Sequence, residues 1–180
     1  ARVAEALGES RTAADCRARA ARAGDAISAR LFDQRRGIHA LDLHADGKRT
    51  WTQTALHAVA LVLGATTPAR AAKWLDQVAG DAFSARWGVR LLPTTDPLFS
   101  PSSYHGGTVW PLLTGWTACA EYRAGRVQAA FRHLAANASL AWRRQLGAFD
   151  EVLHGLEERS AGVCADQAWS AAMVIAPLVE

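Results

Sequence analysis

The stretch SSYHGGTVWP, residues 102–111, is the part of this 180-residue chain that says most about its fold. Gly106 and Gly107 permit a sharp turn, because glycine accepts positive φ and has no Cβ. After Pro111 the residues 112–122 have the pattern of a helix, and proline is favoured in a first helical turn. The stretch is therefore expected to be a loop that turns onto a helix.

Three side chains of this loop suit recognition of a sugar. Tyr104, His105 and Trp110 combine aromatic faces with hydrogen-bonding groups. The C–H faces of a sugar stack on rings, and its hydroxyls need directed polar partners. We expect all three side chains on the substrate side of a site, with a core position as the alternative for Trp110.

The composition is that of a globular chain with one core. Half of the residues are hydrophobic and 21% are charged, which is ordinary for such a domain. No apolar run is long enough to span a bilayer. The net charge of +3 is small and the arginines are dispersed, whereas a nucleic-acid surface needs a clustered basic patch. We expect neither a membrane nor a nucleic-acid partner.

The cysteines and histidines do not form a recognisable metal-binding pattern. Cys16, Cys119 and Cys164 are widely separated and are expected to be free, buried thiols in a reducing compartment, hence a cytoplasmic location. The histidines lack ligand spacing, and no glycine-rich phosphate loop follows a strand. No metal or other cofactor is expected.

Helical patterns dominate the chain. Residues 37–43 and 49–51 predict a short β-hairpin around the Asp46-Gly47 turn. The hydrophobic residues of 81–107 show neither helical nor strand periodicity, so this stretch is expected to be a loop. So long a loop in a compact domain is usually functional. Helices are predicted at residues 10–32 with Ser10 as N-cap, 53–63, 68–78, 109–122, 126–145, and 166–178 with Asp166 as N-cap.

One predicted helix has a clear apolar stripe. Helical spacing places five side chains on one face of residues 126–145, and we expect that face to be buried. The helices and their long loops at alternate joints indicate an all-α array of helical hairpins. The stripe consists of Val127, Phe131, Leu134, Ala138 and Ala141.

Four motifs in fixed order carry a family resemblance. WGVR, SYHGGTVWP, DEVLHG and CADQAWSAA begin at Trp87, Ser103, Asp150 and Cys164. Together they resemble the C-terminal half of glycogen-debranching, amylo-α-1,6-glucosidase-like enzymes, which are (α/α)6-barrel glycoside hydrolases. The chain departs from the family pattern at Gly106, where the family has Asn, and at Asp150, where it has Pro. Both changes are expected to alter the sugar subsites.

The resemblance implies a partial catalytic domain. A full (α/α)6 barrel has six helical hairpins and about twice this length, whereas residues 1–180 supply about three. We expect a single partial domain, the C-terminal half of the barrel, in a chain that starts mid-protein. The general acid of the family would then lie in an earlier loop. The expected partner is the missing N-terminal half or a second copy of the chain.

The resemblance assigns the role of general base to Glu151. Inverting glycosidases use one carboxylic acid to protonate the leaving oxygen and one carboxylate to activate water. Without the resemblance, Glu151 would be taken as a surface acid in a loop that also contains Asp150, Glu157 and Glu158.

Four further residues of the motifs are expected on the substrate side. Trp87 and Arg90 precede the long loop, and Gln167 and Trp169 open the last helix. An arginine there can orient a hydroxyl or carboxylate, and the alternative is a salt bridge that pins the loop. Structural roles remain the alternative for all four.

These observations predict an inverting hydrolase of α-1,6 branch points in glycogen-like glucans. Another (α/α)6 glycosidase, of trehalase, mannosylglycerate or rhamnosidase type, is the first alternative, because motifs fix a scaffold better than a substrate. A non-catalytic, carbohydrate-binding helical module is the second. An oligo- or polysaccharide is the expected ligand.

Overall fold

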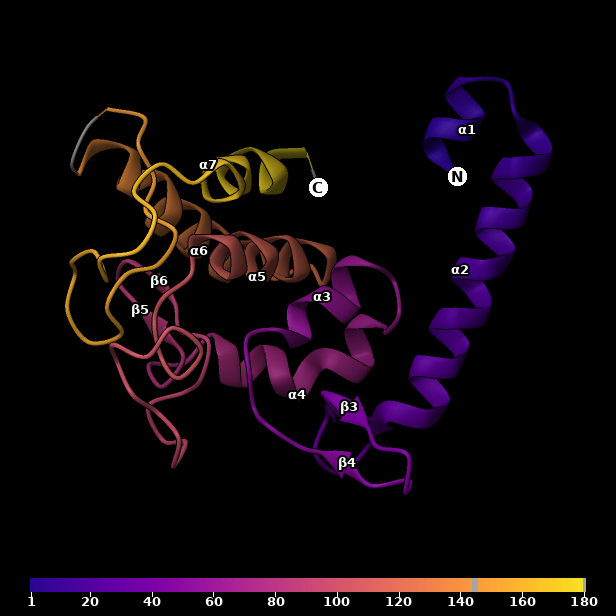
Figure 1. Cartoon of the computed structure of the whole chain (residues 1–180), viewed down its shortest axis with the longest axis horizontal. Coiled ribbons are helices and arrows are strands. Elements are labelled where there is room, and N and C mark those ends of the chain that lie inside the picture. Colours follow the sequence, from indigo (N-terminus) through magenta and orange to yellow (C-terminus); the bar gives the residue numbers. More distant parts are fainter. Residues whose placement is uncertain (144–145, 180) are drawn as a thin grey trace.

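A computed structural model describes residues 1–143 and 146–179 (Figure 1). About half of these residues are helical, which confirms a helix-rich chain. Two 3-10 turns, Leu140–Trp142 and Ala176–Val179, follow the last two helices. The α-helices are α1 (Arg2–Ala6), α2 (Ser10–Leu31), α3 (His57–Val62), α4 (Pro68–Val78), α5 (Pro111–Arg123), α6 (Val127–Ser139) and α7 (Ala168–Ile175).

Three short antiparallel ribbons accompany the helices. β1 (Phe32–Asp33) pairs with β2 (Ile38–His39), and β3 (Asp42–Leu43) pairs with β4 (Arg49–Thr50). The predicted hairpin at residues 37–51 is therefore present, but its first strand is divided between two ribbons. β5 (Ser84–Ala85) and β6 (Gly88–Val89) form a third ribbon inside the long loop.

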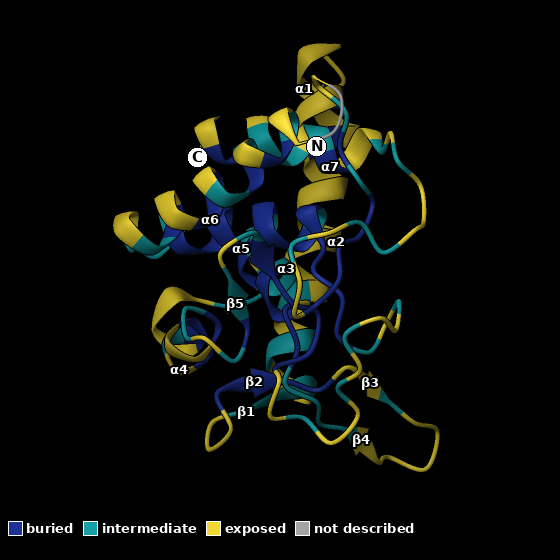
Figure 2. Ribbon diagram, turned by 90° about the vertical axis from the view of Figure 1, so that its left-hand side faces the viewer, coloured by how far each residue is buried: buried dark blue, intermediate teal, exposed yellow. Residues whose placement is uncertain are grey.

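Helix α5 is the centre of the packing. It contacts α3, α6 and α7, and its side chains are buried around most of its circumference (Figure 2). Helix α2 differs, because Ala13 is its one buried residue and it stands apart from the stack of α5, α6 and α7 (Figure 1). Because α5 contacts both α3 and α7, these three helices form one continuous layer.

The segments that precede α3, α5 and α7 are joined by backbone hydrogen bonds. The Ala55 N–H donates to Leu91 C=O at 3.0 Å, and the Leu91 N–H donates to Thr108 C=O at 3.0 Å. Val109 and Leu153 exchange two bonds, of 2.9 and 2.8 Å. We call this series the loop ladder. It places three stretches that are distant in sequence at one edge of the helical layer.

Several predicted helix boundaries were wrong by a few residues. Val109 pairs with Leu153 in the ladder, so α5 begins later, at Pro111. Ser10 is the first residue of α2, not its cap, and α7 is preceded by Gln167 instead of Asp166. Neither helix start has a side-chain cap hydrogen bond. The predicted end of α6 at residue 145 lies outside the described residues.

The predicted apolar stripe of α6 was right at Leu134, which is buried, and wrong at Val127 and Phe131. Val127 and Phe131 are 61% and 62% exposed, whereas the buried face consists of Ala130, His133, Leu134 and Asn137. His133 and Asn137 are buried because they have partners. His133 contacts Glu121, and the Asn137 amide donates to Pro111 C=O at 3.1 Å. Polar groups with such partners share the buried face with the apolar side chains of Ala130 and Leu134.

The thiols only partly match expectation. None of the three cysteines forms a disulfide within the described residues, but Cys16 and Cys164 are exposed, and only Cys119 is buried. In the described part of the chain, no helix combines the length and the apolar character that crossing a bilayer requires.

The α6 packing makes a testable distinction between two apolar side chains. Leu134→Ala leaves a cavity against α5, and we expect it to lower the free energy of unfolding by about 3 kcal/mol. Phe131→Ala removes an exposed ring and should change that free energy by no more than about 0.5 kcal/mol. Urea unfolding followed by circular dichroism measures both. A larger loss in the Phe131 variant would contradict this packing.

Candidate active site

Glu151 and Tyr104 meet although 47 residues separate them. The Tyr104 hydroxyl donates a hydrogen bond of 2.6 Å to Glu151 Oε1. Glu151 is 6% exposed, so its carboxylate lies just below the surface. Within the described residues Oε2 accepts no hydrogen bond. The structure thus brings together the residue predicted as base and the first aromatic residue of the motif.

The hydrogen bond affects the ionisation of the phenol. It raises the pKa of Tyr104 to about 12, and desolvation and the charge of Glu151 act in the same direction. A tyrosinate beside a carboxylate would be a pair of like charges, so the neutral phenol is favoured. Tyr104 therefore remains a donor to Glu151 throughout the physiological pH range.

Backbone contacts on both sides hold the loop that carries Glu151. The Glu151 N–H donates to Cys164 C=O at 2.8 Å, and the Gly155 N–H donates to Pro101 C=O at 2.8 Å. A Cβ at Gly155 would collide with the Gly107 carbonyl oxygen. The two motif loops therefore approach each other more closely than a side chain at residue 155 would allow.

The two motif glycines are required because they lack a side chain, and not because of their backbone torsions. Neither Gly106 nor Gly107 has positive φ, contrary to the expected use of that freedom. A Cβ at Gly107 would instead meet the Phe99 ring, and one at Gly106 would meet Ser103. Close packing within the loop is the constraint on both residues.

Arg90 and Trp87 hold this loop by donating to backbone carbonyls. Buried Arg90 donates from Nε to Gly155 C=O at 2.6 Å and from Nη1 to Asp81 C=O at 2.9 Å. Burial lowers the pKa of Arg90 from a value so high that the guanidinium stays charged. The Trp87 indole donates to His154 C=O at 3.1 Å. Both side chains are engaged in support of the Glu151 loop, and Arg90 acts through carbonyls and not through the salt bridge that was the alternative to a substrate-side position.

The three aromatic residues of the motif differ in exposure. Trp110 is 8% exposed, and its indole N–H donates to Thr108 Oγ1 at 3.0 Å. The His105 ring stacks on the Trp110 ring at 5.9 Å between centroids, and Tyr104 packs edge-on against both. His105 is exposed and Tyr104 half-buried. His105 is thus open to solvent, whereas Trp110 supports the loop from the core.

The C-terminal motif contributes mainly backbone contacts. The Gln167 N–H donates to Phe149 C=O at 2.9 Å, which ties the start of α7 to the Glu151 loop. Trp169 is 43% exposed and therefore does not form an enclosed pocket floor within this chain. Asp150 accepts a hydrogen bond from Ser160 at 3.0 Å.

A second buried constellation was missed by the sequence analysis. Glu121 Oε2 lies 2.7 Å from His133 Nδ1, and His133 Nε2 lies 2.8 Å from Ser84 Oγ. The order resembles a nucleophile, base and acid, but Ser84 donates its only proton to Val78 C=O at 2.6 Å. Ser84 must then accept from His133, so the group ties α5, α6 and β5 together without an activated nucleophile. Glu121 and His133, which lie on two consecutive predicted helices, were the signal that could have revealed this constellation.

The arrangement supplies one carboxylate for acid–base chemistry. Glu151 is oriented by Tyr104 and retains a free oxygen, as a base that accepts a proton from water requires. Among the described residues, no group of three or more His, Cys, Asp or Glu side chains is arranged to hold a metal ion.

The Tyr104–Glu151 contact can be tested by titration. Glu151→Gln removes the charge that opposes ionisation, so the pKa of Tyr104 should fall from about 12 towards 10. The ultraviolet absorbance of tyrosinate measures this transition, and Tyr104→Phe identifies it by removing it. An unchanged Tyr104 titration in the Gln variant would show that the two groups are not in contact.

The fold and the site can now be compared with known proteins. Structures of a GH63 mannosylglycerate hydrolase from Thermus thermophilus are similar to this chain. The complex with Tris is 26% identical at a TM-score of 0.68, over 83% of this chain and 35% of that one. The complex with Tris and D-glycerate is 26% identical at 0.67, over 83% and 36%. The glucose complex is 24% identical at 0.66, over 83% and 37%.

This chain therefore spans little more than a third of the length of those solved proteins. A search of curated proteins found no match. Residues 1–170 match a family described as the mannosylglycerate hydrolase MGH1-like glycoside hydrolase domain. The match extends over nearly the whole chain and includes every motif except the end of the last one. The chain belongs to the MGH1-like glycoside hydrolase family.

Proposed function

We propose that this chain is the base-bearing part of an inverting glycoside hydrolase. The observation that carries the proposal is the buried Glu151 carboxylate, fixed through Oε1 by the Tyr104 hydroxyl at 2.6 Å. Family membership supports the reaction class. The contacts of the Glu151 loop support the role, because a catalytic carboxylate needs an orientation held by its surroundings.

In the proposed mechanism Glu151 activates water. Oε2 accepts a proton from a water molecule as the oxygen of that water attacks the anomeric carbon. The bond from that carbon to the leaving oxygen breaks, and a carboxylic acid on the opposite side protonates the leaving oxygen. Tyr104 keeps Oε1 engaged, so that Oε2 receives the proton. We place the general acid outside residues 1–180, on the remaining part of an (α/α)6 barrel.

The proposed substrate is a small α-glycoside of mannosylglycerate type. The similar solved proteins are described as mannosylglycerate hydrolases, one in complex with D-glycerate and one with glucose. These similarities favour the mannosylglycerate alternative over glycogen debranching, the first interpretation of the motifs. The chain has Gly106 and Asp150 where the debranching family has Asn and Pro, and these differences are consistent with a different sugar subsite.

The same comparisons suggest how the active site is completed. The chain covers about a third of those proteins, and the layer α3–α5–α7 is what half of a helical barrel would contribute. We propose residues 1–180 as one partial domain whose partner is the rest of such a barrel. A reducing, cytoplasmic location remains part of the proposal.

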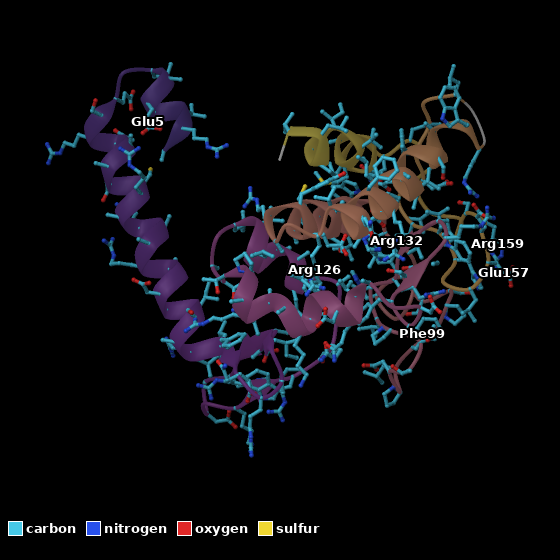
Figure 3. The ribbon with its side chains drawn as sticks, turned by 180° about the vertical axis from the view of Figure 1, so that it is seen from behind. Glu5, Phe99, Arg126, Arg132, Glu157 and Arg159 are labelled. Atoms are coloured by element: carbon cyan, nitrogen blue, oxygen red, sulfur yellow. The ribbon has the colours of Figure 1, made fainter. Side chains whose placement is uncertain are left out.

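The role of Glu151 predicts the effect of one substitution. In the enzyme that contains this chain, Glu151→Gln should reduce kcat about a thousandfold, because loss of a general base costs a factor of this order. Binding of the glycoside should persist. Glu157→Gln is the matched control, since Glu157 lies on the same loop but pairs with exposed Arg159 at the edge of the molecule (Figure 3). Normal turnover by the Glu151 variant would refute the assignment.

Substrate choice separates the remaining alternatives. Mannosylglycerate, glucosylglycerate, trehalose and a branched glucan should be compared by kcat/KM, with the anomer of the first product followed by NMR. The proposal expects highest kcat/KM for a glycerate glycoside and inversion at the anomeric carbon. Preference for the branched glucan would restore the debranching interpretation. Saccharide binding without hydrolysis of any substrate would indicate a binding module.

A further inference from the structure

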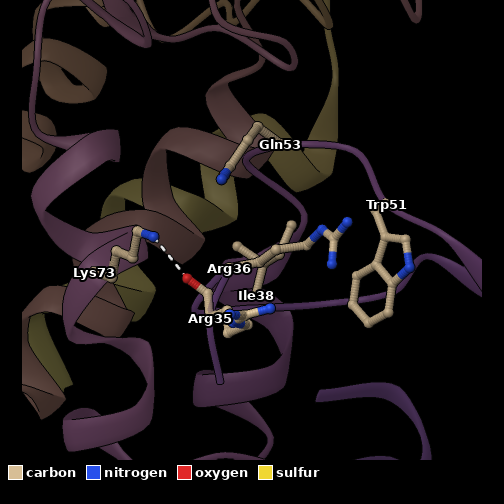
Figure 4. Close-up of a pocket in the computed structure, with 6 residues that line it drawn as sticks. All are labelled: Arg35, Arg36, Ile38, Trp51, Gln53 and Lys73. Carbon is tan, nitrogen blue, oxygen red and sulfur yellow. Dashed lines mark hydrogen bonds between the residues drawn. The ribbon is translucent and has the colours of Figure 1, made fainter. Parts of the chain in front are cut away.

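A crevice of about 460 Å³ lies beside the ribbon β1–β2 and helix α4, and Glu151 is not among its lining residues (Figure 4). Three cationic side chains line it, together with an indole, an amide and one aliphatic side chain. None of these residues belongs to the four motifs. The lining residues are Arg35, Arg36, Lys73, Trp51, Gln53 and Ile38.

Not all of the positive charge in this crevice is balanced. Arg36 is paired with Asp33 at 3.0 Å, and its guanidinium lies 4.9 Å from the centroid of the Trp51 ring. Lys73 Nζ donates at 2.7 Å to Arg35 C=O, which is a neutral acceptor (Figure 4). In the described chain the Arg35 guanidinium has no ion-pair partner. Two uncompensated cations therefore remain, those of Arg35 and Lys73.

Nearby acids are already engaged elsewhere. Asp33 accepts from both the backbone and the side chain of Arg36, and these bonds hold its pKa below the ordinary value. Asp76, one turn from Lys73 on α4, pairs with Arg126 at 2.6 Å. The excess charge at the crevice thus has no carboxylate of the described residues to neutralise it.

The Lys73 side chain is also held in place before any ligand binds. Gly37 has φ of +70°, and a Cβ there would meet the aliphatic part of Lys73, so the loop packs directly against that side chain. The carbonyl of Arg35 fixes the far end of Lys73. A pre-ordered donor loses less conformational entropy on binding than a free surface lysine does.

The amide of Gln53 adds hydrogen-bonding capacity. Its Oε1 is buried and has no donor among the described residues, and the side chain extends towards Lys73 and Arg36 (Figure 4). The amide nitrogen of Gln53 faces the crevice and can donate to a ligand oxygen (Figure 4). Gln53 directly precedes the Thr54–Ala55 segment, which enters the loop ladder beside Leu91. The crevice therefore adjoins the edge of the helical layer that the motif loops occupy.

We propose that this crevice binds a small polyhydroxy carboxylate. The carboxylate would accept hydrogen bonds from Lys73 and Arg35, and a hydroxyl would accept one from the Gln53 amide nitrogen. This inference is independent of the proposed hydrolase function, because the crevice shares no lining residue with the Glu151 site.

Isothermal titration calorimetry on the 180-residue chain tests the proposal. D-Glycerate is the probe, glycerol is its uncharged analogue, and inorganic phosphate tests a different anion. We expect roughly millimolar binding of D-glycerate, weakened by added salt, and no measurable binding of glycerol. Equal affinity for glycerol, or binding of phosphate but not of D-glycerate, would overturn the proposal.

Matched variants locate the site. Lys73→Met and Arg35→Ala should each weaken D-glycerate binding about tenfold, as expected for loss of a charge-assisted hydrogen bond. Lys48→Met is the control, because the only other lysine of the chain is exposed and paired with Asp46. Arg35→Ala also guards against misfolding, since that exposed side chain makes no ion pair with the described residues. Unchanged affinity in the Arg35 variant would exclude this crevice.

One more variant separates this inference from the proposed function. Glu151→Gln should leave D-glycerate binding unchanged, because Glu151 does not line the crevice. If Glu151→Gln alters the affinity and Lys73→Met does not, the carboxylate binds at the motif loops and the inference fails. A failure of hydrolysis in any assay would leave this binding result unaffected.

Discussion

Val109 and Leu153 exchange two backbone hydrogen bonds, of 2.9 and 2.8 Å, between loops that precede different helices. This pairing sets the register of the two loops, so Tyr104 on one and Glu151 on the other come within 2.6 Å. Gly155 permits the close approach, since any larger residue would collide with Gly107. The orientation of the carboxylate therefore follows from backbone pairing, and the aromatic residues only complete it.

Buried polar side chains hydrogen-bond to the loops and short ribbons of this fold. Arg90 donates to carbonyls of two loops, and the His133–Glu121 pair connects two helices to ribbon β5–β6. Buried polar groups are tolerated when they are hydrogen-bonded, and loops contain carbonyls that no helix or sheet satisfies. Removing Arg90 would therefore leave several buried acceptors without donors. These contacts explain how loops without regular structure can hold a carboxylate in one orientation.

Much of the helical framework could be predicted from local signals. α4 has the predicted bounds, because Pro68 suits its first turn and the Thr67 hydroxyl accepts from the Arg70 N–H at 3.3 Å. The Asp46-Gly47 turn likewise forms a hairpin, with Gly47 at φ +83°. Prediction failed where burial depends on a partner. Phe131 is exposed, whereas His133 is buried because the facing helix offers a carboxylate as its partner.

Four ordered motifs and the family resemblance they carry were enough to identify a helix-rich glycosidase scaffold and to propose Glu151 and the Tyr104 loop as its chemical centre. Only the folded chain decided that Tyr104 contacts Glu151, that Trp110 lies in the core and that Arg35 and Lys73 share one crevice. The physical reason is the separation in sequence between the residues that interact. Helix periodicity and turn chemistry depend on neighbours a few residues away, whereas these contacts depend on backbone pairing between segments far apart in sequence.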